Sequence, residues 1–326
     1  MNSLFIFNSD LRLKNNPALS NASLNGSSLT TVFIFNPKKW NNHNESNLKI
    51  AFQIEHLKEL SEKLKNLNIP LKIINANGIE DESKKIIDFV KKNEIQEVFI
   101  NKEYGVNEMQ RDETLQKDLE RMNKKLNIFD SSIFHPDSIK TQSDTFFKVF
   151  TPFSRAFRSK LMSRKIEISE LPKRQEHAIS VSDRIESFKL DKNDQEIFNQ
   201  YEIGEEKALE KLESFIDHKI LNYKENRDFP SLDGTSALSP YLSSGILSSG
   251  QCIYYVFQKY SEDEIGVKTW VNEIIWREFY KYITYHFSHV SKGKCFNPKY
   301  DHILWREDEE SFIKWCEGKT GIPIID

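Results

Sequence analysis

The sequence predicts an N-terminal α/β domain with a doubly wound, Rossmann-like parallel sheet, followed by an all-α domain. Over the first 130 residues, short apolar runs alternate with helical patterns, and beyond Gly204 the strand signal disappears. Such alternation is typical of βαβ units, whose crossover helices cover both faces of a parallel sheet. A chain of 326 residues has room for two cores, at about 150 residues per domain.

Five strands are expected because their apolar runs are continuous enough to be buried on both faces. They are Ser3–Phe7, Thr31–Phe35, Leu71–Asn75, Glu97–Ile100 and Asn127–Phe129. Apolar residues at helical spacing between the strands predict three helices: Ile50–Leu67, Ile79–Lys92 and Asn107–Lys125. No G-x-G-x-x-G follows the first strand, which disfavours an NAD-type dinucleotide site at that turn.

Periodicity fades and charge rises between Lys160 and Glu202, which indicates a connector between domains. We therefore predict an α/β domain over residues 1–130, a connector over 131–203 and a helical domain over 204–326. Helices are expected in this last part at Glu205–Tyr223, Gln251–Tyr260, Lys268–Phe287 and Glu309–Glu317.

Composition limits the partners and the compartment. With 46 basic and 49 acidic residues, the chain has a net charge of −3, so an anion-binding surface must be a local patch. Three cysteines without C-x-x-C spacing argue against a disulfide framework or a cysteine zinc site, and favour a reducing cytoplasm. No stretch approaches the roughly 20 apolar residues of a membrane span. We expect a soluble cytoplasmic protein without a metal.

The segment Gly234–Gly250 (GTSALSPYLSSGILSSG) could bind an anion. Thr235, Ser236 and Ser239 precede Pro240, which is well placed at the first position of a helix. Hydroxyls and free N–H groups at such a position suit a phosphate. The alternative is an ordinary capped turn between two helices.

The helical pattern of Lys268–Phe287 carries a second candidate site. Glu273, Trp276, Arg277 and Tyr280 are spaced i, i+3, i+4 and i+7, so they share one helix face. A carboxylate, a flat indole, a guanidinium and a phenol on one face suit a site that stacks a planar ring and binds charge beside it. The alternative is an i,i+4 Glu–Arg pair next to an interfacial tryptophan.

Basic and aromatic residues alternate in His286–Arg306 (HFSHVSKGKCFNPKYDHILWR). Lys292, Lys294, Lys299 and Arg306 face a single acid there, a composition suited to phosphates and unstacked bases. A solvated basic loop is the alternative. The three histidines of the segment are not at metal-ligand spacing.

Taken together, five segments resemble the DNA photolyase/cryptochrome family, and most closely its bacterial class I cyclobutane pyrimidine dimer photolyases. They are SDLRLKNNPAL, FKVFTPFSRAFR, GTSALSPYLSSGILS, WVNEIIWREFYKYI and WCEGKTGIPIID, which occur in this order along the whole chain. The resemblance implies a deoxyribodipyrimidine photo-lyase, in which excited reduced FAD donates an electron to a flipped-out dimer in UV-damaged DNA. The helical domain would then be the FAD-binding domain.

The resemblance also assigns roles to particular residues. It implies contacts to the FAD phosphates, ribityl chain and flavin pocket by Tyr223, Thr235, Ser236, Ala237, Leu238, Ser239 and Trp270. It implies a DNA and lesion surface made by Arg227, Glu273, Trp276 and Arg277, to which we add Tyr280 from the shared helix face. For a 5,10-methenyltetrahydrofolate antenna it implies Asn107, Glu108 and Lys292, and for the outer end of a tryptophan electron chain Trp305.

Several alternatives stay open at this level. A cryptochrome-like photosensor would use the same cofactors without repair, although it would not need a dimer-stacking face. The antenna could be another chromophore, and the lesion a 6-4 photoproduct. Because the family continues with further helices beyond the position of Asp326, we expect a fragment of a longer gene product, the other possibility being a truncated remnant without catalysis. The family expectation for oligomeric state is a monomer.

Overall fold

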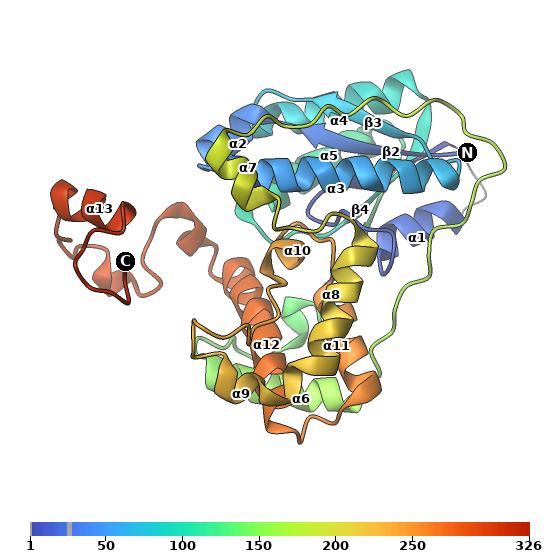
Figure 1. Cartoon of the computed structure of the whole chain (residues 1–326). Coiled ribbons are helices and arrows are strands. Elements are labelled where there is room, and N and C mark those ends of the chain that lie inside the picture. Colours follow the sequence, from blue (N-terminus) through green and yellow to red (C-terminus); the bar gives the residue numbers. More distant parts are fainter. Residues whose placement is uncertain (1, 25–27) are drawn as a thin grey trace. The chain divides into compact units, whose positions relative to one another are not determined.

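A five-stranded parallel sheet forms the centre of the N-terminal half in the computed structural model, which describes residues 2–24 and 28–326 (Figure 1). The strand order is β3-β2-β1-β4-β5, so the winding direction reverses between β1 and β4. Each predicted strand is confirmed, and the predicted fold class with it. The strands are β1 (Asn2–Phe7), β2 (Ser28–Phe35), β3 (Leu71–Asn75), β4 (Ile95–Asn101) and β5 (Lys125–Phe129).

Alternating side chains of the central strand enter two separate cores. Leu4 and Ile6 join a core under α4 (Ile79–Lys92) and α5 (Val106–Arg121). Phe5 and Phe7 join the other core, with α1 (Pro17–Leu24) and α3 (Asn47–Asn66). This alternation follows from the period of two along a strand. It explains why an unbroken apolar run was needed here, since both faces of the sheet are covered.

The helix predicted at Asn107–Lys125 is wrong at its C-terminal end. α5 stops at Arg121, Asn123 adopts a positive φ of 53°, and Lys125 already begins β5. Asparagine tolerates this left-handed conformation better than most residues, which allows the chain to turn tightly into the strand. The polar run Met122-Asn123-Lys124-Lys125 therefore contains a turn that helical spacing alone does not reveal.

The helical half continues the second core without a break. Buried residues of its helices, such as Phe153, Leu212, Val256 and Ile275, belong to the same cluster as Phe5 of the sheet. The helices are α6 (Phe150–Ser163), α7 (Lys192–Phe198), α8 (Glu205–His218), α9 (Tyr223–Asn226), α10 (Ser239–Ser243), α11 (Ser249–Lys259) and α12 (Ile265–His286); α2 (Pro37–Asn42) lies in the N-terminal half.

Buried polar groups join the loop after β1 to the helical half. The Arg12 guanidinium donates to the carbonyl of Gly245 at 2.8 Å, and the Glu205 carboxylate accepts from the backbone N–H groups of Leu13 and Lys14 at 2.9 and 2.8 Å. Gly245 has a φ of +69°, and a Cβ there would lie 1.9 Å from the Ser9 carbonyl oxygen. Only glycine lets the two backbones approach this closely.

The segment after α6 covers the outer edge of the sheet. It runs extended past β3 before α7 begins (Figure 1). The Asp183 N–H donates to the carbonyl of Leu71 at 2.8 Å, and its carboxylate accepts from the N–H of Ile73 at 2.9 Å. Pairing an edge strand in this way removes a surface on which other strands could add.

The described chain forms two compact units, Met1–His286 and Phe287–Asp326. The second contains the short helices η3 (Ser288–Lys292) and η4 (Pro298–Tyr300) and the helix α13 (Glu309–Cys316). Both predicted domain boundaries, near residues 130 and 203, fall inside the first unit and remain predictions. No helix among the described residues is long and apolar enough to cross a membrane.

Candidate functional site

A cleft of about 730 Å³ lies between the carboxyl ends of β1, β4 and β5 and one face of α12. Ligands of doubly wound sheets bind at this edge, where the strand order reverses. The loops after the strands contribute Ser9, Lys102, Glu103, Tyr104, Gly105, Ser131 and Ser132. The helix contributes Glu273, Trp276, Arg277, Tyr280, Lys281 and Thr284.

The structure therefore brings together the four residues that spacing had placed on one helix face: Glu273, Trp276, Arg277 and Tyr280 all line this cleft. The opposite face of α12 is buried through Val271, Ile274, Ile275, Phe279 and Tyr282. Because that apolar face is fixed in the core, the polar and aromatic face has to point into the cleft.

Trp276 lies among aromatic rings. Its indole is stacked on Phe150, with centroids 3.4 Å apart and an interplanar angle of 6°. Tyr280, one turn further along α12, is stacked less closely at 5.6 Å and 24°, and 62% of it is exposed. The cleft thus contains the indole of Trp276, stacked on another ring, beside the solvent-exposed phenol of Tyr280.

Two predicted DNA-contacting residues form an ion pair with each other. A guanidinium nitrogen of Arg227 lies 2.5 Å from a carboxylate oxygen of Glu273. This hydrogen bond raises the pKa of Arg227. Arg277 donates to the carbonyl of Leu242 at 2.7 Å, which ties α12 to the end of α10. Arg227 is thus paired with the cleft residue Glu273, whereas Arg277 lines the cleft itself.

Sequence reasoning missed Tyr104 and Lys281, which also line the cleft. Lys281 contacts Glu278 at 3.2 Å, and burial lowers the pKa of this lysine. The Tyr104 hydroxyl donates to Asp130 at 2.6 Å; burial and that carboxylate raise the pKa of the tyrosine. Lys281 follows Arg277 by four residues, so helical spacing could have identified it. Tyr104 had no such signal, because it lies in a loop after β4.

The predicted phosphate loop has hydroxyl groups that are available to bind a phosphate. Among the described residues, none forms a hydrogen bond with the hydroxyls of Thr235, Ser236 or Ser239. Ala237 has a positive φ of 49°, and Pro240 is the second residue of α10 rather than the predicted first. Unpaired hydroxyls before a helix fit the phosphates of FAD.

The other predicted flavin-pocket residues are buried. Leu238 is 1% exposed, Tyr223 is 8% exposed, and Trp270 is 2% exposed. The Trp270 indole packs against Phe215 with centroids 5.3 Å apart, so in this structure it forms part of the core. Their roles toward FAD remain predictions.

The predicted antenna residues belong to different units. Asn107 and Glu108 lie in the first turn of α5, and the Glu108 carboxylate contacts Lys39 at 3.0 Å. Although burial raises it, the pKa of Glu108 lies below its ordinary value because Lys39 is so close. Lys292 ends η3 in the second unit and is exposed. Trp305 lies in the same unit and is 77% exposed.

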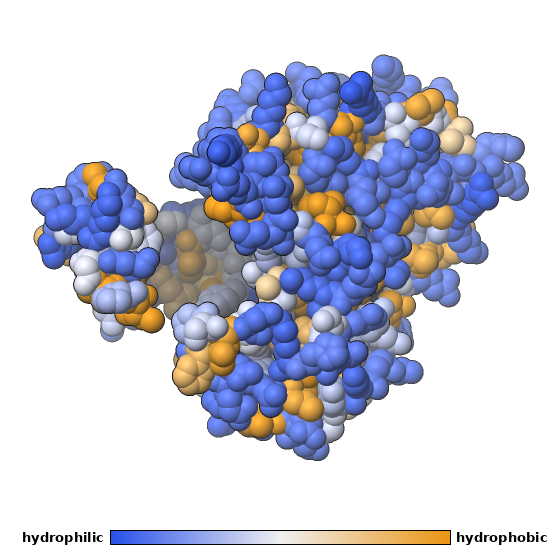
Figure 2. Space-filling view, in the orientation of Figure 1, coloured by the Kyte–Doolittle hydropathy of each residue, from blue (hydrophilic) through white to orange (hydrophobic). Residues whose placement is uncertain are grey.

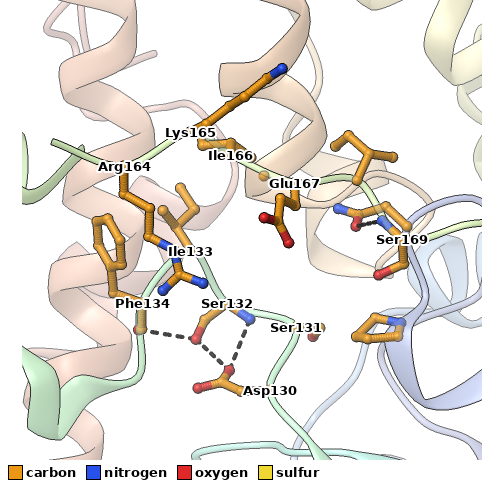
Figure 3. A pocket seen from close by; sticks show the side chains of 14 residues that line it. Asp130, Ser131, Ser132, Ile133, Phe134, Arg164, Lys165, Ile166, Glu167 and Ser169 are labelled. Carbon is orange, nitrogen blue, oxygen red and sulfur yellow. Dashed lines mark hydrogen bonds between the residues drawn. The ribbon is translucent and has the colours of Figure 1, made fainter. Parts of the chain in front are cut away.

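A second, polar pocket of about 280 Å³ lies next to the loop after β5 (Figure 3). In Figure 3, Asp130 accepts hydrogen bonds from Ser132, while Arg164 and Glu167 point into the space from the extended segment after α6. None of the predicted site residues lines this pocket. No group of histidine, cysteine and carboxylate side chains in the described part of the chain could hold a metal ion.

Comparison with known proteins gives two family matches. Residues 3–175 match the family model described as DNA photolyase, and residues 270–326 match that of the FAD binding domain of DNA photolyase. The deoxyribodipyrimidine photo-lyase of Vibrio cholerae is 30% identical over 98% of this chain and 69% of its own length. The enzyme of that name from Buchnera aphidicola of Acyrthosiphon pisum is 33% identical over 99% and 68%.

Among solved structures, this chain is similar to a bacterial class III photolyase from Agrobacterium tumefaciens. The TM-score is 0.83 at 27% sequence identity, and the match covers 99% of this chain and 67% of that chain.

Proposed function

Because this chain belongs to the DNA photolyase family, we propose that it works as a deoxyribodipyrimidine photo-lyase, which repairs cyclobutane pyrimidine dimers in UV-damaged DNA with bound FAD. The observation that carries the proposal is the face of α12 in the cleft, where Glu273, Trp276, Arg277 and Tyr280 lie together. This face combines a stacking surface with hydrogen-bonding and charged groups, as a flipped-out dimer requires.

In this proposal, the lesion leaves the duplex and enters the cleft. Extrusion costs a few kcal/mol, and less for a damaged base pair that stacks poorly, which favours the lesion over intact DNA. Trp276 stacks on the dimer, and base–aromatic stacking contributes about 1–3 kcal/mol per base. Glu273 accepts a hydrogen bond from a base N–H, while its ion pair with Arg227 holds the carboxylate in position.

The residues for FAD are those of the loop before α10. The hydroxyls of Thr235, Ser236 and Ser239 would donate to the phosphates, and Tyr223, Ala237, Leu238 and Trp270 would complete the pocket. FAD, when bound, supplies the light-driven electron that splits the cyclobutane ring. The protein contributes the surface that binds and orients FAD.

We further propose an antenna site for 5,10-methenyltetrahydrofolate at Asn107, Glu108 and Lys292, and a monomeric enzyme. Glu108 would bind the pterin N–H groups as an ionised carboxylate, a state that its contact with Lys39 favours. The variant Glu108→Ala should lose the folate absorption band while FAD is retained. Equal folate retention by the variant would exclude this site.

The decisive experiment compares Trp276→Ala with the wild-type chain, both loaded with FAD. We expect the affinity for a thymine-dimer oligonucleotide to fall by roughly 5- to 150-fold, the equivalent of about 1–3 kcal/mol, while binding to undamaged DNA stays constant. Trp315→Ala is the matched control, since this tryptophan is 59% exposed in the second unit.

The same assay decides between lesions and between functions. An oligonucleotide with a 6-4 photoproduct, tested in parallel, determines the lesion class. A wild-type chain that photoreduces FAD but neither prefers nor repairs dimers would contradict the proposed repair function and favour a photosensor.

A further inference from the structure

Phe150 makes the closest aromatic contact of Trp276. The two rings are almost parallel, at 3.4 Å and 6°, whereas Phe279 meets the same indole edge-on at 5.8 Å and 73°. Trp276 lines the cleft, but Phe150 is absent from the described residues that line it. Phe150 therefore covers one face of the indole without itself lining the cleft.

Phe150 is held in this position by its neighbours. It is the first residue of α6, and Phe153, one turn later, is 1% exposed in the core. Before it, the N–H of Phe147 donates to the Tyr282 hydroxyl at 2.9 Å, and that hydroxyl donates to the carbonyl of Ile139 at 3.1 Å. The chain is thus anchored to α12 or the core on both sides of Phe150.

We propose that Phe150 is a positioning residue for Trp276, which fixes the indole plane so that a flat lesion can stack on its open face. The inference rests on the proposed function. An indole has two faces, and the contact with Phe150 occupies one of them. A side chain already held in its bound orientation loses less conformational freedom when the ligand arrives, so binding is tighter.

The test uses three variants of Phe150 and one control in the FAD-loaded chain. Phe150→Ala removes the ring, Phe150→Leu keeps apolar volume without a ring, and Phe150→Tyr keeps the ring. Phe146→Ala is the matched control. Like Phe150, Phe146 is stacked on an aromatic side chain of α12, in this case His286, at 3.6 Å and 20°. The first readout is the ratio of affinities for dimer-containing and undamaged oligonucleotides.

We expect Phe150→Ala and Phe150→Leu to lower that ratio by about 5- to 10-fold, and Phe150→Tyr to restore it. Phe146→Ala should leave it unchanged. A ratio that rises in Phe150→Ala would overturn the proposal, since Phe150 would then occupy the seat of the lesion. A ratio that does not change, or that falls equally in Phe146→Ala, would overturn it as well.

A second readout needs no DNA. Acrylamide quenching of Trp276 fluorescence, obtained as the difference from the same variants in a Trp276→Phe background, should increase about 2-fold in Phe150→Ala and not in Phe150→Tyr. If the wild-type chain shows no preference for dimers, the proposed function fails, and quenching alone decides whether Phe150 positions Trp276. Unchanged quenching in Phe150→Ala would overturn the positioning role.

Discussion

The two compact units differ sharply in how far their apolar side chains are buried. In the first unit, Phe5 and Val256 are fully buried in one continuous core. In the second, no residue from 287 to 326 is buried, and Leu304 and Ile324 are 97% and 83% exposed. Hydrophobic residues accordingly reach the surface around α13 (Figure 2). An amphipathic pattern predicts a helix, but only a partner surface buries it.

This difference bears directly on the site. Glu273 and Trp276 project from a helix whose other face is packed in the core, so their positions follow from the packing of the first unit. Lys292 and Trp305 lie in the second unit, where no residue is buried, so no packed core fixes the positions of their side chains. Variants that remove the same kind of group from each unit test the contrast.

The largest difference is expected for two phenylalanines, one in each unit. Phe153→Ala removes a ring that is 1% exposed and should lower the free energy of unfolding by about 3–5 kcal/mol. Phe312→Ala removes a ring that is 56% exposed beside Trp315, and should change it by less than about 0.5 kcal/mol. Urea unfolding followed by circular dichroism measures both. Equal losses would show that the second unit has a core of its own.

Most of the fold could be predicted because its signals are local. The run Ser3–Phe7 lies within β1, and the predicted Ile79–Lys92 coincides with α4 at both ends, where acidic residues begin the helix and lysines end it. The shared face of Glu273 and Trp276 was likewise predictable, since a helix of known phase fixes which residues are neighbours.

The rest could not be predicted because it depends on contacts between distant segments. The stack of Phe150 on Trp276 joins residues 126 positions apart (276 − 150), and the ion pair of Arg227 with Glu273 joins two different helical regions. Spacing within one helix carries no information about such partners. The turn at Asn123 was missed for a different reason, since a single left-handed residue ended a pattern that otherwise continued.

A smaller difference is expected in how stability depends on pH. One carboxyl group in the first unit and one in the second contribute to stability with opposite pH dependence. Burial raises the pKa of Asp10 to about 6, although Asn101 and Arg12 lower it. The folded chain then holds this proton more tightly than the unfolded chain, whose pKa is near 3.8, so the contribution of Asp10 to stability is lost as pH rises from about 4 to 6. Hydrogen bonds from Ser311 lower the pKa of Asp308 to about 2, so its contribution is lost as pH falls instead.

Unfolding at several pH values measures the Asp10 effect. Relative to Asp10→Asn, which cannot titrate, the wild-type chain should lose about 2 kcal/mol of stability between pH 4 and pH 7. If the substitution itself changes stability by an amount that does not depend on pH, the expected loss with rising pH is unaffected. A difference between the two chains that is independent of pH would contradict the raised pKa.

The smallest difference is expected at two helix N-caps. The Ser248 hydroxyl accepts from the N–H of Gln251 at 3.0 Å and from the Asn15 amide at 2.8 Å, so it caps α11 and also contacts the loop after β1. Ser248→Ala should therefore lower the free energy of unfolding by about 1 kcal/mol. Asp308 caps α13 through the N–H of Ser311 at 3.0 Å, but that helix contains no buried residue.

Asp308→Ala should consequently lower the helicity of α13, measured by amide chemical shifts, without a resolvable change in the main unfolding transition. The reason is that a cap contributes to global stability only when its helix unfolds together with the core. If Asp308→Ala shifted the main transition as much as Ser248→Ala does, the two units would have to unfold as one, and the exposed residues around Trp305 would have to be held more firmly than their burial indicates.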